Sequence, residues 1–208
     1  MKYLMPPIAL LGILMGANCV AADEVSPETL RAARAVAVTS CATCHGPQGR
    51  SIAPKFPRLA GQSADYIAAQ MKNFKAHTRG DADALAYMWG MAAPLEDDQI
   101  AGLAQYYSAQ RPGPGEASDA GAMSRGRAVY AEGVAAGGVP ACATCHGANA
   151  AGVGAFPRLA GQSAQYLLKQ LNAFHTNTRD VAVMHGVTTG LSADNMKDVA
   201  AYLASLGP

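Results

Sequence analysis

The pentapeptide Cys-Ala-Thr-Cys-His occurs twice in this chain of 208 residues. Two cysteines separated by two residues and followed at once by histidine form the attachment pattern of a c-type haem. Each thiol can form a thioether to one side of a porphyrin, and the adjacent histidine can then ligate the iron. The sequence therefore predicts two covalently bound haem c groups and a redox role. The predicted attachment and ligand residues are Cys41, Cys44 and His45 in the first copy and Cys142, Cys145 and His146 in the second.

Two other uses of paired cysteines fit this sequence less well. A zinc site draws its four ligands from nearby segments, whereas these two pairs lie about a domain's length of chain apart. A thioredoxin-like redox motif has one cysteine pair beside a strand-helix-strand pattern, whereas the flanking sequence here is rich in Ala and Gly. A histidine also follows both pairs, which favours haem.

The second axial ligand of each iron decides the chemistry. A strong second ligand gives an electron carrier, whereas an open position admits substrate or oxygen. Aligning Leu95 with Leu191 places Met88 on Met184, so each half offers a thioether at the same distance before the matched leucine. We predict Met88 and Met184 as the ligands because of this matched position, since most methionines only fill the core.

The remaining candidate ligands have no matching partner in the other half. Met91 aligns with Val187, a replacement that core packing allows. Three other histidines are expected at the surface or in local hydrogen bonds, and these are His77, His175 and His185. His185 adjoins Met184 and stays open as a rival ligand. Its counterpart Trp89 is expected to cover the haem edge or to pack in the core.

Two repeated residues are candidates for holding the haem histidines. A ligating histidine normally donates its second ring N–H to a carbonyl or a carboxylate. Pro57 and Pro157 follow the motifs, and the fixed φ of proline could present a backbone carbonyl rigidly or simply stiffen a loop. Arg58 and Arg158 could pair with haem propionates through their planar, always charged guanidinium groups, although solvent-facing arginines are common.

The first residues have the pattern of a secretory signal peptide. Lys2 precedes an apolar run over residues 8–17, and a small-residue cleavage site ends at Ala22. We therefore predict a signal peptide at residues 1–22. As a membrane anchor the run would fall short of the roughly 20 apolar residues that cross a bilayer. At most peripheral membrane association is expected.

A long internal repeat divides the rest of the chain. Residues 56–64, Phe-Pro-Arg-Leu-Ala-Gly-Gln-Ser-Ala, return unchanged as residues 156–164. Residues 111–122 are rich in Pro, Gly and small polar residues, which cannot continue a helix. We expect one domain at residues 23–110, a linker at 111–122 and a second domain at 123–208. Each half is small, and a buried haem would supply much of its apolar core.

Charge and periodicity bound the fold class and the partners. Removing Lys2 from the 16 basic residues leaves 15 against 15 acidic residues, so nucleic-acid binding is not indicated. Apolar residues recur at helical spacing after Ser63, a predicted N-cap, and again in a closing segment around Ile100. Shorter leading helices are predicted at residues 27–39 and 123–132. No alternating strand pattern competes, so the fold class is all-α.

These features together resemble the dihaem cytochrome c4 family, which consists of two tandem class I cytochrome c domains. The resemblance rests on both haem motifs, both repeated nonapeptides, Met88 and Met184, and the closing segment from Leu95. It implies His/Met ligation at both irons and a histidine-holding role for the Pro57 and Pro157 carbonyls. It also implies a periplasmic location, because covalent haem attachment takes place outside the cytoplasm.

The resemblance further implies what the protein does. It points to a carrier of single electrons rather than an enzyme, working from a quinol-oxidising or dehydrogenase complex toward a terminal oxidase. A second reading is the dihaem subunit of a flavoprotein dehydrogenase complex of the sulfide dehydrogenase type. A third is a dihaem peroxidase, against which the two methionines count because a peroxidase needs a haem that opens to peroxide.

One departure from the class I pattern concerns the leading helices. In class I domains this helix often carries a glycine and an aromatic residue that pack on the closing helix. Gly126 and Tyr130 supply them in the second half, whereas the first half offers only alanines such as Ala33 and Ala37. Its helix contact is therefore expected to be looser.

Overall fold

A computed structural model describes residues 25–208, so the predicted signal peptide lies outside the described residues. Within 25–208 the chain is helical, and its only β-type pairings are two isolated bridges. The predicted all-α class is therefore confirmed. The α-helices are α1 (Pro27–Val36), α2 (Ala42–His45), α3 (Ala64–Lys75), α4 (Trp89–Ala92), α5 (Asp97–Ser108), α6 (Ala120–Glu132), α7 (Ala143–His146), α8 (Ala164–His175), α9 (Ala182–Thr189) and α10 (Ala193–Ser205).

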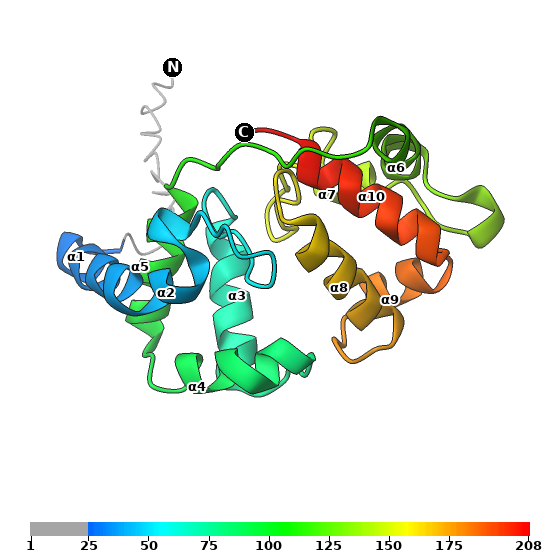
Figure 1. The fold of residues 1–208 in the computed structure, drawn as a ribbon. Helices are drawn as coiled ribbons and strands as arrows, with labels where there is room; N and C mark the ends of the chain where they lie inside the picture. Colours follow the sequence, from blue (N-terminus) through cyan, green and yellow to red (C-terminus); the bar gives the residue numbers. More distant parts are fainter. Residues whose placement is uncertain (1–24) are drawn as a thin grey trace, which may run out of the picture.

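The helices form two bodies that lie side by side (Figure 1). Helices α1–α5 make the first half and α6–α10 the second, and an extended segment between α5 and α6 runs along one edge of the molecule. This segment packs on the second half, because the Glu116 N–H donates to the Ala204 carbonyl at 2.8 Å. Helix α6 begins at Ala120, where the Asp119 carboxylate accepts from the Ala122 N–H, so the last residues of the predicted linker are helical.

One continuous helical run delivers the first haem motif. Helix α1 begins after Ser26, whose hydroxyl accepts from the Thr29 N–H, and Pro27 suits its first position because proline has no N–H to satisfy. The run continues through a wide π-helical turn at Ala37–Cys41 into α2. The leading helix is therefore longer than the predicted 27–39. In the second half a loop separates α6 from α7, and a bridge between Val134 and Val139 closes that loop.

The middle and closing helices begin at side-chain caps. The Ser63 and Ser163 hydroxyls accept from backbone N–H groups in the first turns of α3 and α8. Helices α5 and α10 begin with capping boxes, in which the cap residue and the third helical residue satisfy each other's backbone N–H groups. Helix α3 thus begins at the predicted N-cap Ser63, and α8 begins at the equivalent Ser163 of the repeat.

The leading helix crosses the closing helix closely in both halves. In the second half the glycine lies on the leading helix, and a Cβ added at Gly126 would lie 2.0 Å from the Asp198 carbonyl oxygen. In the first half the glycine lies on the closing helix, and a Cβ added at Gly102 would lie 2.8 Å from the Ala33 Cβ. Ala33 is 2 % exposed. Gly102 thus supplies a close approach from the other helix, but the added Cβ meets a side chain at 2.8 Å rather than backbone at 2.0 Å, so the contact is looser in the first half, as expected.

The core of each half surrounds this crossing. In the first half Ala33, Ala37 and Tyr107 belong to one buried cluster with the closing helix. In the second half Tyr130 takes the aromatic place, and its hydroxyl donates to the Gly147 carbonyl at 2.6 Å. No helix of the described residues is long and apolar enough to cross a membrane.

Candidate haem sites

The two motif histidines lie at the ends of short helices and have the same surroundings. His45 ends α2 and His146 ends α7, and each is followed by a glycine with positive φ, 74° and 81°, which turns the chain away. The His45 Nδ1 lies 2.9 Å from the Pro57 carbonyl oxygen, and the His146 Nδ1 lies 3.0 Å from that of Pro157. A carbonyl only accepts, so Nδ1 carries the proton. Nε2 is therefore the nitrogen with a lone pair for iron.

Burial keeps both histidines in the form that a metal needs. His45 and His146 are 8 % and 7 % exposed. Burial lowers the pKa of both imidazoles, and the hydrogen bond to the proline carbonyl opposes this only in part. Each ring also meets the edge of a phenylalanine, Phe56 or Phe156, with ring centroids 6.2 Å apart. The neutral, oriented ring is the state that ligates iron.

In each motif the first cysteine lies about one helical turn before the histidine, and the second cysteine directly precedes it. All four are half-buried, and Cys41 and Cys142 each belong to the helical core of their half. Burial raises the pKa of the Cys41 and Cys142 thiols. Positions three apart on a helix share one face, so both sulfurs of a motif can reach the same side of a porphyrin.

The two matched methionines stand on different local structures. Met88 ends a π-helical turn at Ala84–Met88 and packs against a small cluster built on Phe74. Met184 lies in α9, and its carbonyl accepts from the Thr188 hydroxyl. Both side chains are half-buried. The first half has four more residues than the second between the matched arginine, Arg79 or Arg179, and the matched methionine. These additional residues therefore lie before and within the wide turn.

The residues near each methionine fit a porphyrin face. Leu85 and Tyr87 precede Met88 with 50 % and 42 % exposure, and Val183 beside Met184 is 58 % exposed.

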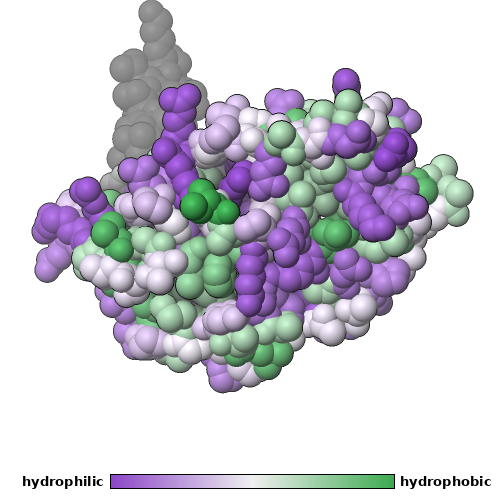
Figure 2. All heavy atoms as spheres, viewed as in Figure 1, coloured by the Kyte–Doolittle hydropathy of each residue, from purple (hydrophilic) through white to green (hydrophobic). Residues whose placement is uncertain are grey.

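On the face of the molecule shown in Figure 2, strongly hydrophobic residues lie in small separate groups among polar ones. The described residues contain no cluster of three His, Cys, Asp or Glu side chains that could hold a bare metal ion. An imidazole, a thioether and two thiols per half therefore suit haem c rather than a bare ion.

The other histidines make local contacts. The rings of His77 and Trp89 stack at 4.0 Å, His175 Nδ1 donates to the Thr188 carbonyl, and His185 Nδ1 donates to the Phe174 carbonyl. The Trp89 indole N–H donates to the Arg79 carbonyl at 2.8 Å. These contacts give His175 and His185 the local hydrogen bonds that the sequence predicts.

Comparison with known proteins identifies the family. The Cytochrome c family model matches residues 30–108 and again 123–207. Cytochrome c-552 of Acidithiobacillus ferridurans is 44 % identical over 81 % of this chain and 74 % of its own length. Cytochrome c4 of Azotobacter vinelandii is 38 % identical over 80 % of this chain and 84 % of its own length. The chain belongs to the dihaem cytochrome c4 family. It therefore carries two covalently bound haem c groups, one in each half, and it is an electron carrier.

Solved structures agree with this assignment. The cytochrome c4 structure of Acidithiobacillus ferrooxidans superposes with a TM-score of 0.76 at 41 % identity, covering 80 % of this chain and 98 % of that one. Reduced cytochrome c4 of Pseudomonas stutzeri gives 0.77 at 32 % identity, covering 85 % and 98 %. A protein named thiosulfate dehydrogenase electron acceptor, from Thiomonas intermedia, is 37 % identical over 80 % of this chain and 78 % of its own length. The class I fold is thus present twice in this cytochrome.

The two repeated arginines of the cytochrome lie between its halves. The Arg58 guanidinium pairs with Glu116 at 3.0 Å and donates to the Gly161 carbonyl at 2.6 Å. The Arg158 guanidinium donates to the Gly207 carbonyl at 3.2 Å, and burial lowers the pKa of this arginine. The Arg58 guanidinium thus binds a carbonyl of the opposite half, whereas that of Arg158 binds a carbonyl of its own half; pairing of either with haem propionates stays a prediction.

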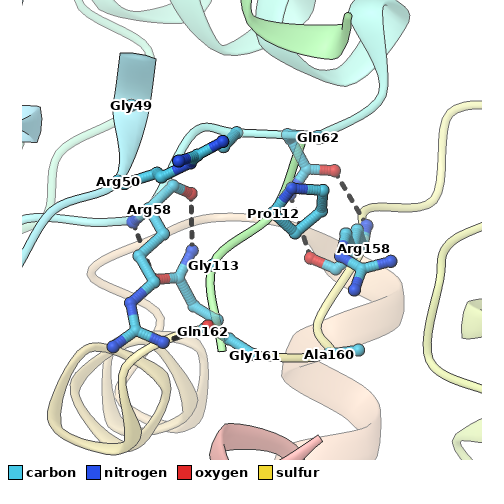
Figure 3. A pocket seen from close by; sticks show the side chains of 11 residues that line it. Gly49, Arg50, Arg58, Gln62, Pro112, Gly113, Arg158, Ala160, Gly161 and Gln162 are labelled. Carbon is cyan, nitrogen blue, oxygen red and sulfur yellow. Dashed lines mark hydrogen bonds between the residues drawn. The ribbon is translucent and has the colours of Figure 1, made fainter. Parts of the chain in front are cut away.

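Two glutamines form reciprocal hydrogen bonds across the interface, which we call the amide clasp (Figure 3). The Gln162 Oε1 accepts from the Arg58 N–H at 2.8 Å, and its Nε2 donates to the Arg58 carbonyl at 2.9 Å. The Gln62 side chain makes the same two bonds to the backbone of Arg158, at 2.8 and 2.9 Å. Each half therefore holds the backbone of the other next to its histidine-binding proline.

A second set of polar residues, the arginine cluster, is buried between α3 and α8. It consists of Tyr66, Gln70, Arg79 and Asp81 from the first half and Tyr166, Gln170 and Arg179 from the second. Each arginine donates to the glutamines of both halves and to the tyrosine of the opposite half. Arg79 also pairs with Asp81 at 2.6 Å. Burial raises the pKa of Tyr66, but the charges of Arg179 and Arg79 outweigh burial, and the pKa is lowered.

The sequence features considered above predict neither the amide clasp nor the arginine cluster. Gln62, Tyr66, Gln70 and Arg79 each have an identical residue 100 positions later. Polar residues at helical spacing usually indicate a solvated face, so periodicity alone hides them. Identity between the halves at polar positions was the available signal, because a merely solvated face does not require particular polar residues.

Proposed function

We propose that this cytochrome carries single electrons in the periplasm, with His45 and Met88 ligating one iron and His146 and Met184 the other. The observation that supports this most is the repeated geometry around each histidine, in which the nitrogen facing a proline carbonyl leaves the other for iron. Haem iron supplies the one-electron chemistry when bound. With a thioether as second ligand, the iron would have no open position for substrate, which supports outer-sphere transfer.

The protein's own residues support this transfer in three ways. The proline carbonyls fix the imidazole rings, so little rearrangement accompanies a change of oxidation state. Burial of His45 and His146 keeps water from the proximal side. The interface contacts hold the two halves in one arrangement, so an electron that enters one half can leave from the other.

Replacing each methionine tests the ligand assignment. We expect Met88→Ala and Met184→Ala each to remove one of two thioether-to-iron absorption bands and to lower one of two reduction potentials, because methionine favours ferrous iron. Met91→Ala is the matched control, since Met91 is 46 % exposed and aligns with a valine. An unchanged spectrum in either ligand variant would refute that ligand.

Two classes of partner fit this carrier. The family resemblance supports transfer toward a terminal oxidase, from a quinol-oxidising or dehydrogenase complex. A second candidate role is the electron-accepting subunit of a dehydrogenase for sulfur compounds, which the relative named thiosulfate dehydrogenase electron acceptor favours. Either docking is expected to be weak and transient for a free carrier.

Fractionation of the native cells separates these roles. A free carrier is expected in the periplasmic fraction with its N-terminus near residue 23, and its reduced form should be oxidised by membranes that contain the oxidase. Stable copurification with a larger dehydrogenase chain would instead establish the subunit role. Recovery of the protein from the cytoplasm with residues 1–22 still attached would contradict the periplasmic proposal.

A further inference from the structure

One peptide unit joins each haem histidine to a side chain of the opposite half. The carbonyl between Pro57 and Arg58 accepts from His45 Nδ1 at 2.9 Å. The N–H of that same peptide unit donates to the Gln162 Oε1 at 2.8 Å. A continuous hydrogen-bonded path therefore runs from the imidazole of the first half to the glutamine of the second.

The second half repeats the path in the opposite sense. The carbonyl between Pro157 and Arg158 accepts from His146 Nδ1 at 3.0 Å, and the N–H of that peptide unit donates to the Gln62 Oε1 at 2.8 Å. Both glutamines are 7 % exposed. Each peptide N–H has its glutamine of the opposite half as the hydrogen-bond acceptor, so each path depends on that glutamine.

Hydrogen bonds in such a path strengthen one another. A bond accepted by Gln162 from the peptide N–H makes the peptide carbonyl a better acceptor, by roughly 10 to 30 % per bond in condensed phase. A better acceptor draws the Nδ1 proton more strongly and makes the imidazole a more basic ligand. A more basic ligand stabilises ferric iron and lowers the reduction potential.

We propose that each glutamine of the amide clasp sets the potential of the haem in the opposite half. Gln162 acts on the haem held by His45, and Gln62 acts on the haem held by His146. Both are positioning residues, since neither touches the histidine that it influences. This proposal rests on the proposed histidine ligation and adds a cross-half coupling to it.

The test is a redox titration of the full haem-loaded chain, with the two waves assigned by NMR contacts of each haem to its own half. We expect Gln162→Leu to raise the potential of the first-half haem and to leave the other unchanged. Gln62→Leu should do the reverse. The expected size is a twofold to fivefold change in the equilibrium constant for reduction, or roughly 20 to 40 mV, since tenfold corresponds to 59 mV.

Two further variants separate this effect from a loosened interface. Gln162→Glu keeps an acceptor oxygen for the Arg58 N–H, so the first-half potential should stay at or below that of the wild type. Ser163→Ala removes another cross-half bond, from the Ser163 hydroxyl to the Pro54 carbonyl at 3.2 Å, together with the hydroxyl cap of α8, without touching the peptide unit. It should leave both potentials unchanged.

The possible outcomes separate failure of the cross-half coupling from failure of the proposed electron-carrier function. Shifts confined to the glutamine's own half, equal shifts in both haems, or equal shifts in Gln162→Leu and Ser163→Ala would overturn the coupling while two low-spin haem waves remained. If the haem irons of the wild-type protein proved not to be ligated by histidine, the proposed function itself would be overturned. If Gln162→Leu does not accumulate, Gln62→Leu alone still decides whether the effect crosses to the other half.

Discussion

The two halves make the same helix crossing with their small and aromatic residues exchanged between the helices. In the second half the leading helix α6 carries Gly126 and Tyr130. In the first half the closing helix α5 carries Gly102 and Tyr107, and the leading helix offers alanines such as Ala33. The close approach needs one residue without a side chain and one ring to fill the adjacent core. The fold does not determine which of the two helices carries the glycine and which carries the aromatic ring.

The arginine cluster shows a second difference between the halves. Its tyrosines, glutamines and arginines are paired across the repeat, but Asp81 lies in the stretch between Arg79 and Met88, which is four residues longer than its equivalent in the second half, and it has no matched residue there. The Arg79 charge therefore meets a carboxylate at 2.6 Å, whereas the Nε of Arg179 is buried without a hydrogen-bond partner among the described residues. The first half thus carries the only carboxylate that this cluster of two guanidinium groups contains.

Removing that carboxylate should give the largest effect. Both partners of the Arg79–Asp81 pair are buried, and removal of one leaves an uncompensated charge. We expect Asp81→Asn to lower the free energy of unfolding of the haem-loaded chain by about 3 kcal/mol. Denaturation in guanidinium chloride measures it. Asp180→Asn removes a nearby exposed carboxylate and should change little, so equal losses in both variants would contradict the pairing.

The effect of Asp81→Asn should also depend on pH. Burial raises the pKa of Asp81, but the hydrogen bond and charge of Arg79 outweigh burial, so the folded pKa lies below the ordinary value. A group with a depressed folded pKa stabilises the protein above its unfolded pKa of about 4. The difference between wild type and variant should therefore shrink as the pH falls from about 4 through the folded pKa. A difference that grows on acidification would contradict this sign.

The helix crossing of the second half should be the next most sensitive. A methyl group at Gly126 would lie 2.0 Å from the backbone oxygen of Asp198, which cannot move without shifting α10. We expect Gly126→Ala to cost about 2 to 3 kcal/mol in the free energy of unfolding. A loss below about 1 kcal/mol would show that the helices separate easily and that the crossing is not tight.

The same change in the first half should cost less. A methyl group at Gly102 would meet the Ala33 side chain at 2.8 Å rather than backbone, and alanine favours the helix over glycine. We expect Gly102→Ala to cost about 1 to 2 kcal/mol. Adding Ala33→Gly should recover most of this loss, since it moves the missing side chain to the leading helix, as in the second half. If the double variant Gly102→Ala, Ala33→Gly were less stable than Gly102→Ala alone, the idea that the glycine can lie on either helix would be refuted.

The two core tyrosines should give the smallest effects. The Tyr130 hydroxyl donates to the Gly147 carbonyl at 2.6 Å, and burial raises the pKa of Tyr130 to about 12. Tyr130→Phe should therefore cost about 1 kcal/mol. The buried Tyr107 hydroxyl has no acceptor among the described residues, so Tyr107→Phe should be neutral. The same unfolding titration compares the two variants. A larger loss of unfolding free energy in Tyr107→Phe than in Tyr130→Phe would contradict the view that only the Tyr130 hydroxyl makes a stabilising hydrogen bond.

Local features could be predicted from the sequence, and pairwise ones could not. The cap at Ser63 and the spacing of α3 and α5 follow from short-range patterns, which determine where a helix begins. The contact between α1 and α5 depends on Ala33 and Gly102 together, so the sequence of the leading helix alone does not show that Gly102 supplies the close approach. The interface joins residues about 100 positions apart, such as Gln62 and Arg158, and no local pattern carries that pairing.

The contact between the halves has the symmetry of a homodimer. The Ser63 hydroxyl donates to the Gly154 carbonyl and the Ser163 hydroxyl to that of Pro54, its repeat equivalent, so one surface patch meets its own copy. Two separate chains would have to find each other in solution, at a cost in translational and rotational freedom. Joining them in one polypeptide makes the association independent of dilution. Even a polar interface that would be too weak to hold two free molecules together can therefore keep this pair assembled.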